Sequence, residues 1–264
     1  MSHHIVQALD IHYTYPDGTV GLAGVSFSIS HGESVALVGE NGAGKSTLLQ
    51  HLNGCLLPES GSVRIGDSFL NPKNLASVRR AVGMVFQNPD DQLFMPTVFD
   101  DVAFGLLNLG FTEDDARRRV AEALETVGAG HLAGRPPYKL SIGEKRAVAI
   151  ATVWAMSPDI LVMDEPSASL DPRSRSRLIA LLQTFKHTKI IATHDLDMAA
   201  QLCERTIVLH QGKVTADGQT VDVFRNEELL HLSSLEKPLG MQNCPVCTTA
   251  ALLKSPRSHH PHGH

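Results

Sequence analysis

The chain has 264 residues, of which 42% are hydrophobic and 19% are charged. This apolar fraction is too high for a disordered chain, and the length suits one large domain or two closely packed subdomains. The formal net charge of −5 argues against a basic surface for nucleic acid, so we expect no nucleic-acid partner. Four cysteines do not make a disulfide framework, which is typical of a reducing compartment.

No segment of the sequence is typical of secretion or of a membrane span. The first residues have neither a basic region nor an apolar run, and the longest uncharged stretch in the middle of the chain, residues 147–158, ends in a proline after 12 residues. We therefore expect a cytoplasmic chain that does not cross a membrane by itself.

Short runs rich in Val and Ile alternate with helical patterns, which is typical of a β-sheet with crossover helices. Buried strands are predicted at residues 34–38, 82–86, 160–163 and 189–193, a helix at 45–53, and a hairpin from 206–210 and 213–216. Strand signals vanish between residues 88 and 158, where 113–127 is strongly helical. The sequence thus predicts an α/β domain over residues 1–236, with a helical subdomain at about 89–157 inserted in its core, and a tail over 237–264.

A glycine-rich loop follows the first of these strands and opens the helix after it. Residues 39–46 match G-x-x-x-x-G-K-[ST], in which backbone N–H groups wrap a phosphate chain at a helix N-terminus. The predicted phosphate-binding residues are Gly39, Asn41, Gly42, Ala43, Gly44, Lys45, Ser46 and Thr47. Lys45 would reach the β- and γ-phosphates, and Ser46 would ligate Mg²⁺. The alternative, a chance glycine turn, does not explain the whole pattern, so the sequence predicts that the chain binds a nucleoside triphosphate.

Two acids end the apolar strand at residues 160–163. Beside the phosphate-binding strand, Asp164 can hold Mg²⁺, directly or through water, and Glu165 can orient and deprotonate an attacking water. Gln87, after the strand at 82–86, could sense Mg²⁺ and this water, and His194, after the strand at 189–193, could donate to the γ-phosphate. The alternatives are solvated acids at a strand end, a turn glutamine and a core imidazole.

Together these motifs resemble the ATPases of ABC transporters, over roughly residues 5–235. The motifs stand in the family's order: 39–47, Gln87, Leu-Ser-Ile-Gly-Glu at 140–144, Asp-Glu-Pro at 164–166, Ser-Leu-Asp at 169–171, and His194. Within this superfamily, residues 86–94 and 97–105 are similar to the energy-coupling-factor importers, and most of all to the cobalt and nickel ATPases.

The resemblance implies a P-loop NTPase fold, with a RecA-like core, an N-terminal antiparallel β region and the helical insert. It also implies a head-to-tail dimer that holds two ATP molecules, each between residues 39–47 of one chain and Ser141, Gly143 and Glu144 of the other. Asp171 would link the two sites, and Tyr15, or less readily Tyr13, would stack on adenine; a core role for either tyrosine is the alternative. A homodimer would have two complete sites, and a second, different ATPase chain stays open.

Residues 140–144 depart from the family pattern, because Leu-Ser-Ile-Gly-Glu replaces Leu-Ser-Gly-Gly-Gln. Ser141 and Glu144 have the spacing of a capping box at the start of a helical run, residues 145–156, so an ordinary helix cap is the alternative to a γ-phosphate contact. The bulk of Ile142 and the charge of Glu144 predict weaker ATP-driven dimerisation, with the repulsion relieved in part if Glu144 folds back onto the Ser141 N–H.

The predicted function is hydrolysis of ATP to power an importer, with cobalt or nickel ions as cargo and ATP and Mg²⁺ as cofactors. The chain would lie peripherally on the cytoplasmic face of the membrane, with transmembrane coupling and substrate-capture proteins as partners. Apolar residues at 94–99 and 102–109 would form a groove for short helices of these partners, or else the insert's own core.

Three other functions stay open. The cargo could be a vitamin or another small molecule. A soluble ABC-type ATPase acting on ribosomes or nucleic acid is disfavoured by the single cassette and the charge of −5. A metal-storage protein would leave the complete ATP site unexplained. The tail residues Cys244, Cys247 and His259, His260, His262 and His264 are either metal ligands or part of a flexible solubilising tail.

Overall fold

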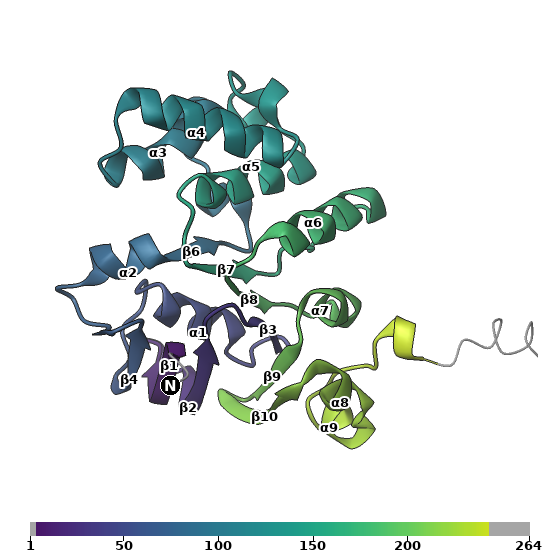
Figure 1. Cartoon of the computed structure of the whole chain (residues 1–264). Coiled ribbons are helices and arrows are strands. Elements are labelled where there is room, and N and C mark those ends of the chain that lie inside the picture. Colours follow the sequence, from purple (N-terminus) through teal and green to yellow (C-terminus); the bar gives the residue numbers. More distant parts are fainter. Residues whose placement is uncertain (1–3, 243–264) are drawn as a thin grey trace, which may run out of the picture.

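The computed structural model describes residues 4–242 of the chain. Its central sheet has six strands in the order β10-β9-β3-β8-β7-β6 (Figure 1). These strands are β10 (Lys213–Gln219), β9 (Arg205–His210), β3 (Ser34–Val38), β8 (Thr188–Ala192), β7 (Ile160–Asp164) and β6 (Val82–Val85). All are parallel except β10, which forms an antiparallel hairpin with β9.

A second sheet, entirely antiparallel, lies against one face of the first. Its strand order is β2 (Val20–Ser30), β1 (His4–Thr14), β4 (Ser60–Ile65) and β5 (Ser68–Phe69). One hydrophobic cluster joins the two sheets around helix α1 (Lys45–Leu52); it includes Val35 and Leu37 of β3. A second cluster covers the other face of the central sheet and includes Ala36 and Val38. Alternate residues of β3 are therefore buried on opposite faces, which is why this strand is a continuous apolar run.

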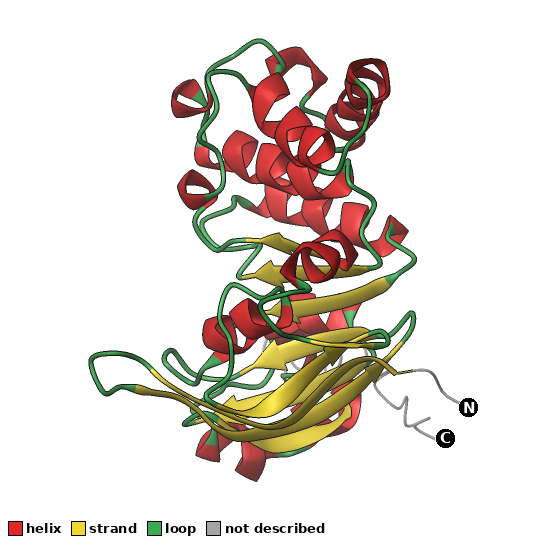
Figure 2. Ribbon diagram, turned by 90° about the vertical axis from the view of Figure 1, so that its left-hand side faces the viewer, coloured by secondary structure: helices red, strands yellow, loops and turns green. Residues whose placement is uncertain are grey.

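The helical insert lies between β6 and β7 and forms its own lobe, away from the antiparallel sheet (Figure 2). Its helices are α3 (Val98–Asn108), α4 (Glu113–Thr126) and α5 (Ile142–Trp154), which pack on one another. Val98, Val102 and Leu106 are completely buried, whereas Phe94, Phe104 and Leu107 are exposed. The predicted apolar groove is therefore divided between the core of the lobe and its surface.

The other helices connect the strands or follow the last one. They are α2 (Leu75–Ala81), α6 (Pro172–Thr184), α7 (Leu196–Leu202), α8 (Thr220–Arg225), α9 (Glu227–Leu232) and the short 3-10 turns η1 (Pro89–Asp91), η2 (Gly130–Leu132), η3 (Pro137–Lys139) and η4 (Leu239–Met241). None of the helices within residues 4–242 combines the length and the apolar character that crossing a membrane requires.

The predicted fold class is confirmed, and the predicted strands lie within a few residues of the observed ones. The capping box expected at Ser141 and Glu144 is present and α5 begins at Ile142, whereas the helical run expected to continue to residue 156 ends at Trp154. The domain boundary at residue 237 stays a prediction. In the described part beyond it, Leu239 and Gly240 donate backbone hydrogen bonds of 3.0 and 2.9 Å to Asp197.

Candidate nucleotide-binding site

A cavity of about 600 Å³ opens where the parallel strands end. Most of the predicted site residues line it: Tyr15, Gly39, Asn41, Gly42, Gly44, Lys45, Ser46, Thr47, Gln87, Asp164, Glu165 and His194. Ala43, Ser141, Gly143, Glu144 and Asp171 do not line it. The cavity also has walls that the motifs did not indicate, from Thr19, Val20 and Gly21 before the loop and Ser234 and Leu235 near the other end of the chain. Those residues carry no recognisable pattern in the sequence.

Two glycines are indispensable to the shape of the phosphate-binding loop. At Gly39, φ is +155° and a Cβ would lie 2.2 Å from the Leu209 carbonyl oxygen. At Gly44, φ is +101° and a Cβ would lie 2.5 Å from the Gly21 carbonyl oxygen. Only glycine fits both positions, and the loop can therefore turn its N–H groups toward the cavity. Ala43 is buried in the core beneath the loop, so only its backbone can serve a ligand.

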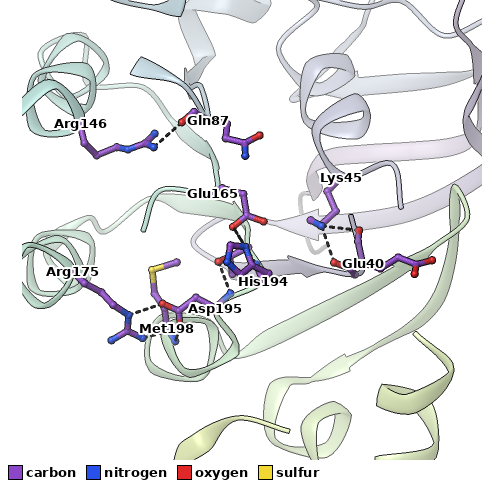
Figure 3. Close-up of polar contacts among 11 residues, drawn as sticks. Glu40, Lys45, Gln87, Arg146, Glu165, Arg175, His194, Asp195 and Met198 are labelled. Carbon is purple, nitrogen blue, oxygen red and sulfur yellow. Dashed lines mark hydrogen bonds and ion pairs between the residues drawn. The ribbon is translucent and has the colours of Figure 1, made fainter. Parts of the chain in front are cut away.

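The Lys45 side chain is held inside this loop. It is 6% exposed, and its Nζ donates hydrogen bonds to the carbonyl oxygens of Gly39 at 2.7 Å and Glu40 at 3.0 Å (Figure 3). Burial lowers its pKa, and the charges of Glu165 and Asp164 oppose this shift. The ammonium group thus stands opposite two carboxylates, across the space that a phosphate chain would occupy.

Asp164, at the end of β7, has the surroundings of a cation ligand. Burial raises the pKa of its carboxyl group, and the nearby Ser46 side chain opposes this shift. Its Oδ1 is buried and has no hydrogen-bond partner among the described residues. A buried carboxylate oxygen without a partner is costly, and a hard divalent cation would satisfy it. Ser46 and Asp164 therefore fit Mg²⁺, and Gln87 lines the same cavity.

Glu165 and His194 meet at the adjacent ends of β7 and β8. The Glu165 side chain is 7% exposed, and its Oε2 accepts a hydrogen bond from the His194 backbone N–H at 3.2 Å and lies 2.7 Å from His194 Nδ1 (Figure 3). The Glu165 backbone is left-handed, with φ of +45°, and its N–H donates to the Ala192 carbonyl. Strain of this kind gathers at functional sites, where the surrounding structure enforces it.

An arginine that the motifs did not indicate holds the loop that carries Gln87. Arg146 in α5 is 3% exposed and donates hydrogen bonds to the carbonyl oxygens of Phe86 at 2.9 Å and Gln87 at 2.6 Å (Figure 3). The only signal for it in the sequence is a charged residue at the edge of an apolar helical run.

Ser141 and Glu144 form the predicted capping box at the start of α5. Glu144 Oε2 accepts hydrogen bonds from the Ser141 N–H at 2.8 Å and the Ser141 hydroxyl at 2.7 Å, and these bonds lower the pKa of Glu144. Glu144 is therefore folded back onto Ser141, while Ile142 is 44% exposed. Asp171 likewise caps α6, accepting from the N–H groups of Arg173 and Ser174.

The two tyrosines have different positions. Tyr15 lines the cavity, and its hydroxyl lies 2.8 Å from Thr47 Oγ1. Tyr13 packs behind it against the core between the sheets. Within residues 4–242, no group of three or more His, Cys, Asp or Glu side chains is arranged to hold a metal ion. The possible ligands Cys244, Cys247 and His259–264 lie outside the described residues.

The α/β fold, the glycine-rich loop at residues 39–46 and the acids Asp164 and Glu165 together define a P-loop nucleotide-binding protein. The family model of the ABC transporter matches residues 22–168. A putative ABC transporter ATP-binding protein of Geobacter sulfurreducens is 65% identical over 94% of this chain and 99% of its own length. An energy-coupling factor transporter ATP-binding protein, EcfA, of Methanothermobacter thermautotrophicus is 46% identical over 89% of this chain and 77% of its own length. Among solved structures, cbiO1 of Clostridium perfringens, part of the ABC transporter complex cbiONQ, has a TM-score of 0.77 and 37% identity, covering 96% of this chain and 100% of its own.

The chain belongs to the ABC transporter family, and it is an ATP-binding, ATP-hydrolysing subunit of a transporter of this kind. The predicted resemblance to energy-coupling-factor ATPases is confirmed.

Proposed function

We propose that this chain powers an energy-coupling-factor importer for cobalt or nickel ions, as a head-to-tail homodimer on the cytoplasmic face of the membrane. The observation that carries the proposal is the convergence of Lys45, Asp164, Glu165 and His194 on one cavity. The kinship with EcfA and the likeness of residues 86–94 and 97–105 to energy-coupling-factor importers support the transporter class. The resemblance to the cobalt and nickel ATPases within that group supports the cargo.

The motif residues at the cavity divide nucleotide binding and hydrolysis among them. The loop N–H groups and Lys45 hold the phosphate chain, and Tyr15 stacks on adenine. Ser46, Asp164 and Gln87 hold Mg²⁺, which when bound neutralises phosphate charge. Glu165 orients an attacking water and takes its proton, because its Oε2 is buried and fixed by His194. His194 donates to the γ-phosphate.

A second copy of the chain completes the site. Ser141 and Gly143 stand outside the cavity, at a helix start that is partly exposed. The free N–H groups of a helix N-terminus attract anions, so in a head-to-tail dimer this end of α5 faces the γ-phosphate on the other chain. Asp171, at the start of α6, lies at the same interface and links the two sites.

The exposed aromatic residues of the helical lobe are the docking surface for the membrane subunits. Phe94 is 63% exposed and Phe104 is 42% exposed, and their rings meet edge to face at 5.0 Å beside the half-exposed Leu107. Exposed apolar groups of this size suit the apolar face of a short partner helix.

Uptake in cells tests the proposal. Cells that lack this chain should lose uptake of radioactive cobalt or nickel, and the wild-type chain should restore it while Glu165→Gln does not. Loss of vitamin uptake instead would overturn the metal cargo and leave the transporter ATPase. Unchanged uptake of metals and vitamins alike would overturn the importer.

A further inference from the structure

Tyr13, Tyr15, Thr47 and His51 form a closed cluster of contacts next to the phosphate-binding loop, with Thr47 taking part through both its hydroxyl and its backbone carbonyl. The Tyr15 hydroxyl lies 2.8 Å from Thr47 Oγ1, and the Thr47 carbonyl oxygen lies 2.7 Å from His51 Nδ1. The His51 ring meets the Tyr13 ring edge to face at 4.9 Å, and the Tyr13 ring meets the Tyr15 ring in the same way at 5.1 Å. This tyrosine–histidine cluster joins the end of β1 to α1, which lies more than 30 residues further along the chain.

His51 is the buried member of the tyrosine–histidine cluster. Its side chain is completely buried, and burial lowers its pKa. Because the Thr47 carbonyl can only accept, Nδ1 carries the hydrogen of a neutral imidazole, and Nε2 has no partner among the described residues. One hydrogen bond therefore fixes the orientation of the imidazole plane, and with it the surface offered to Tyr13.

Tyr15 is held from two sides. A Cβ at Gly21 would lie 3.1 Å from Tyr15 Cε2 and 3.0 Å from Thr47 Cγ2, so the backbone of β2 approaches one side of the ring closely. Tyr13 supports another part of the ring. A stacking aromatic that is already held loses little conformational entropy when a base arrives, which raises affinity without any new contact.

We propose that His51 and Tyr13 are positioning residues that hold the Tyr15 ring for adenine. This inference rests on the proposed adenine contact of Tyr15. Neither His51 nor Tyr13 lines the cavity, so both act through Tyr15.

Equilibrium binding of two probes tests the inference. ADP and inorganic pyrophosphate both present a diphosphate to the loop, but only ADP carries a base, and neither is consumed by hydrolysis. The quantity measured is the ratio of the two dissociation constants in the wild-type chain, Tyr13→Leu, Tyr13→Phe, His51→Asn and Tyr15→Leu. His51→Asn keeps a donor for the Thr47 carbonyl and removes the ring, and Tyr13→Phe keeps the ring.

Tyr13→Leu and His51→Asn should each lower the preference for ADP by about three- to tenfold, the size of one aromatic contact, with pyrophosphate binding unchanged. Tyr13→Phe should bind both probes as the wild type does. Parallel weakening of ADP and pyrophosphate would show a merely structural role and overturn the inference. If Tyr15→Leu lowers the preference for ADP over pyrophosphate but Tyr13→Leu and His51→Asn do not, the inference about Tyr13 and His51 is overturned and the adenine contact of Tyr15 stands. If Tyr15→Leu does not lower this preference either, the adenine contact of Tyr15 itself is overturned.

Discussion

Two neighbouring carboxylates at the end of β7 have different surroundings, and this difference agrees with the different roles proposed for them. Asp164 lies beside Ser46 with one buried oxygen unsatisfied, in the position of a cation ligand. Glu165 has its carboxylate against His194, and its backbone is in a left-handed conformation. Residues adjacent in sequence thus face different groups because the strand ends between them.

Replacing Glu165 by Gln should lower kcat by about 10²–10⁴-fold and leave ATP affinity near that of the wild type, because the amide cannot take a proton from water. Phosphate release and equilibrium ATP binding measure the two effects. Glu228→Gln, the same change at an exposed position of α9, is the control. Full turnover in the Glu165 variant would refute its role as the base.

The raised pKa of Asp164 has a consequence for stability in the metal-free, nucleotide-free chain. A carboxyl group whose folded pKa exceeds its unfolded pKa stabilises the fold below the unfolded value, and this contribution is lost as the pH rises through the folded value. Asp164→Asn does not titrate, so its melting temperature should exceed that of the wild type increasingly as the pH rises, by roughly 2–4 °C for each 1 kcal/mol. Thermal melts in EDTA between pH 4.5 and 8 measure this, with exposed Asp222→Asn as control. A pH-independent difference would contradict it.

At the scale of elements, α5 is attached to the loop between β6 and α3. Arg146 donates to two loop carbonyls, and Gln92 Nε2 donates to the Ala149 carbonyl at 2.8 Å while its Oε1 accepts from the Phe86 N–H at 3.1 Å. Lys145 pairs with Asp90 at 2.5 Å. The helix that begins at the predicted interface with a second chain therefore holds the loop that presents Gln87 to the cavity.

Arg146→Met should lower kcat on the order of tenfold, with a smaller change in ATP affinity, because the Gln87 loop loses two anchoring bonds. Leaving these two part-buried carbonyl groups unpaired should also cost up to about 1–3 kcal/mol of stability. Steady-state kinetics and denaturant melts measure both. Lys145→Ala, which breaks only a partly exposed ion pair, should change kcat little. Equal effects of the two substitutions would argue against a specific role for Arg146.

At the scale of the molecule, the helical lobe and the sheet-containing lobe carry complementary halves of the proposed composite site (Figure 2). Residues 39–47 and the acids lie where the parallel strands end, and Ser141 lies at the start of a helix in the other lobe. Ser141 does not line the cavity of its own chain, which is consistent with the proposed composite site.

Mixing two inactive variants tests this arrangement. Lys45→Ala disables the phosphate-binding loop and Ser141→Arg blocks the helix start, so each homodimer should be inactive. In a two-fold symmetric head-to-tail dimer, half of the mixed dimers formed at equal amounts are heterodimers with one intact site, which predicts about a quarter of wild-type ATPase activity. No recovery on mixing would refute the composite site.

Consecutive residues were enough to predict the phosphate-binding loop, the two acids after β7 and the cap at Ser141. Each of these is a local pattern that involves only a few consecutive residues. The loop is a strand–turn–helix pattern, the acids end a strand, and the cap is an S-x-x-E pattern. The motif order also identified the family and fold class. The C-terminal end of α5 was less accurate, because the helix ends at Trp154 and the helical pattern continues to residue 156.

The tertiary structure alone decided how distant residues act together. It placed Tyr15, just after β1, at the cavity and Tyr13, within β1, behind it, although the two are only two residues apart. It brought Arg146 to Gln87 across 59 residues and the His51 ring in α1 to the Tyr13 ring in β1. Such contacts depend on how helices and sheets pack, and packing between remote segments leaves no periodic trace in the sequence.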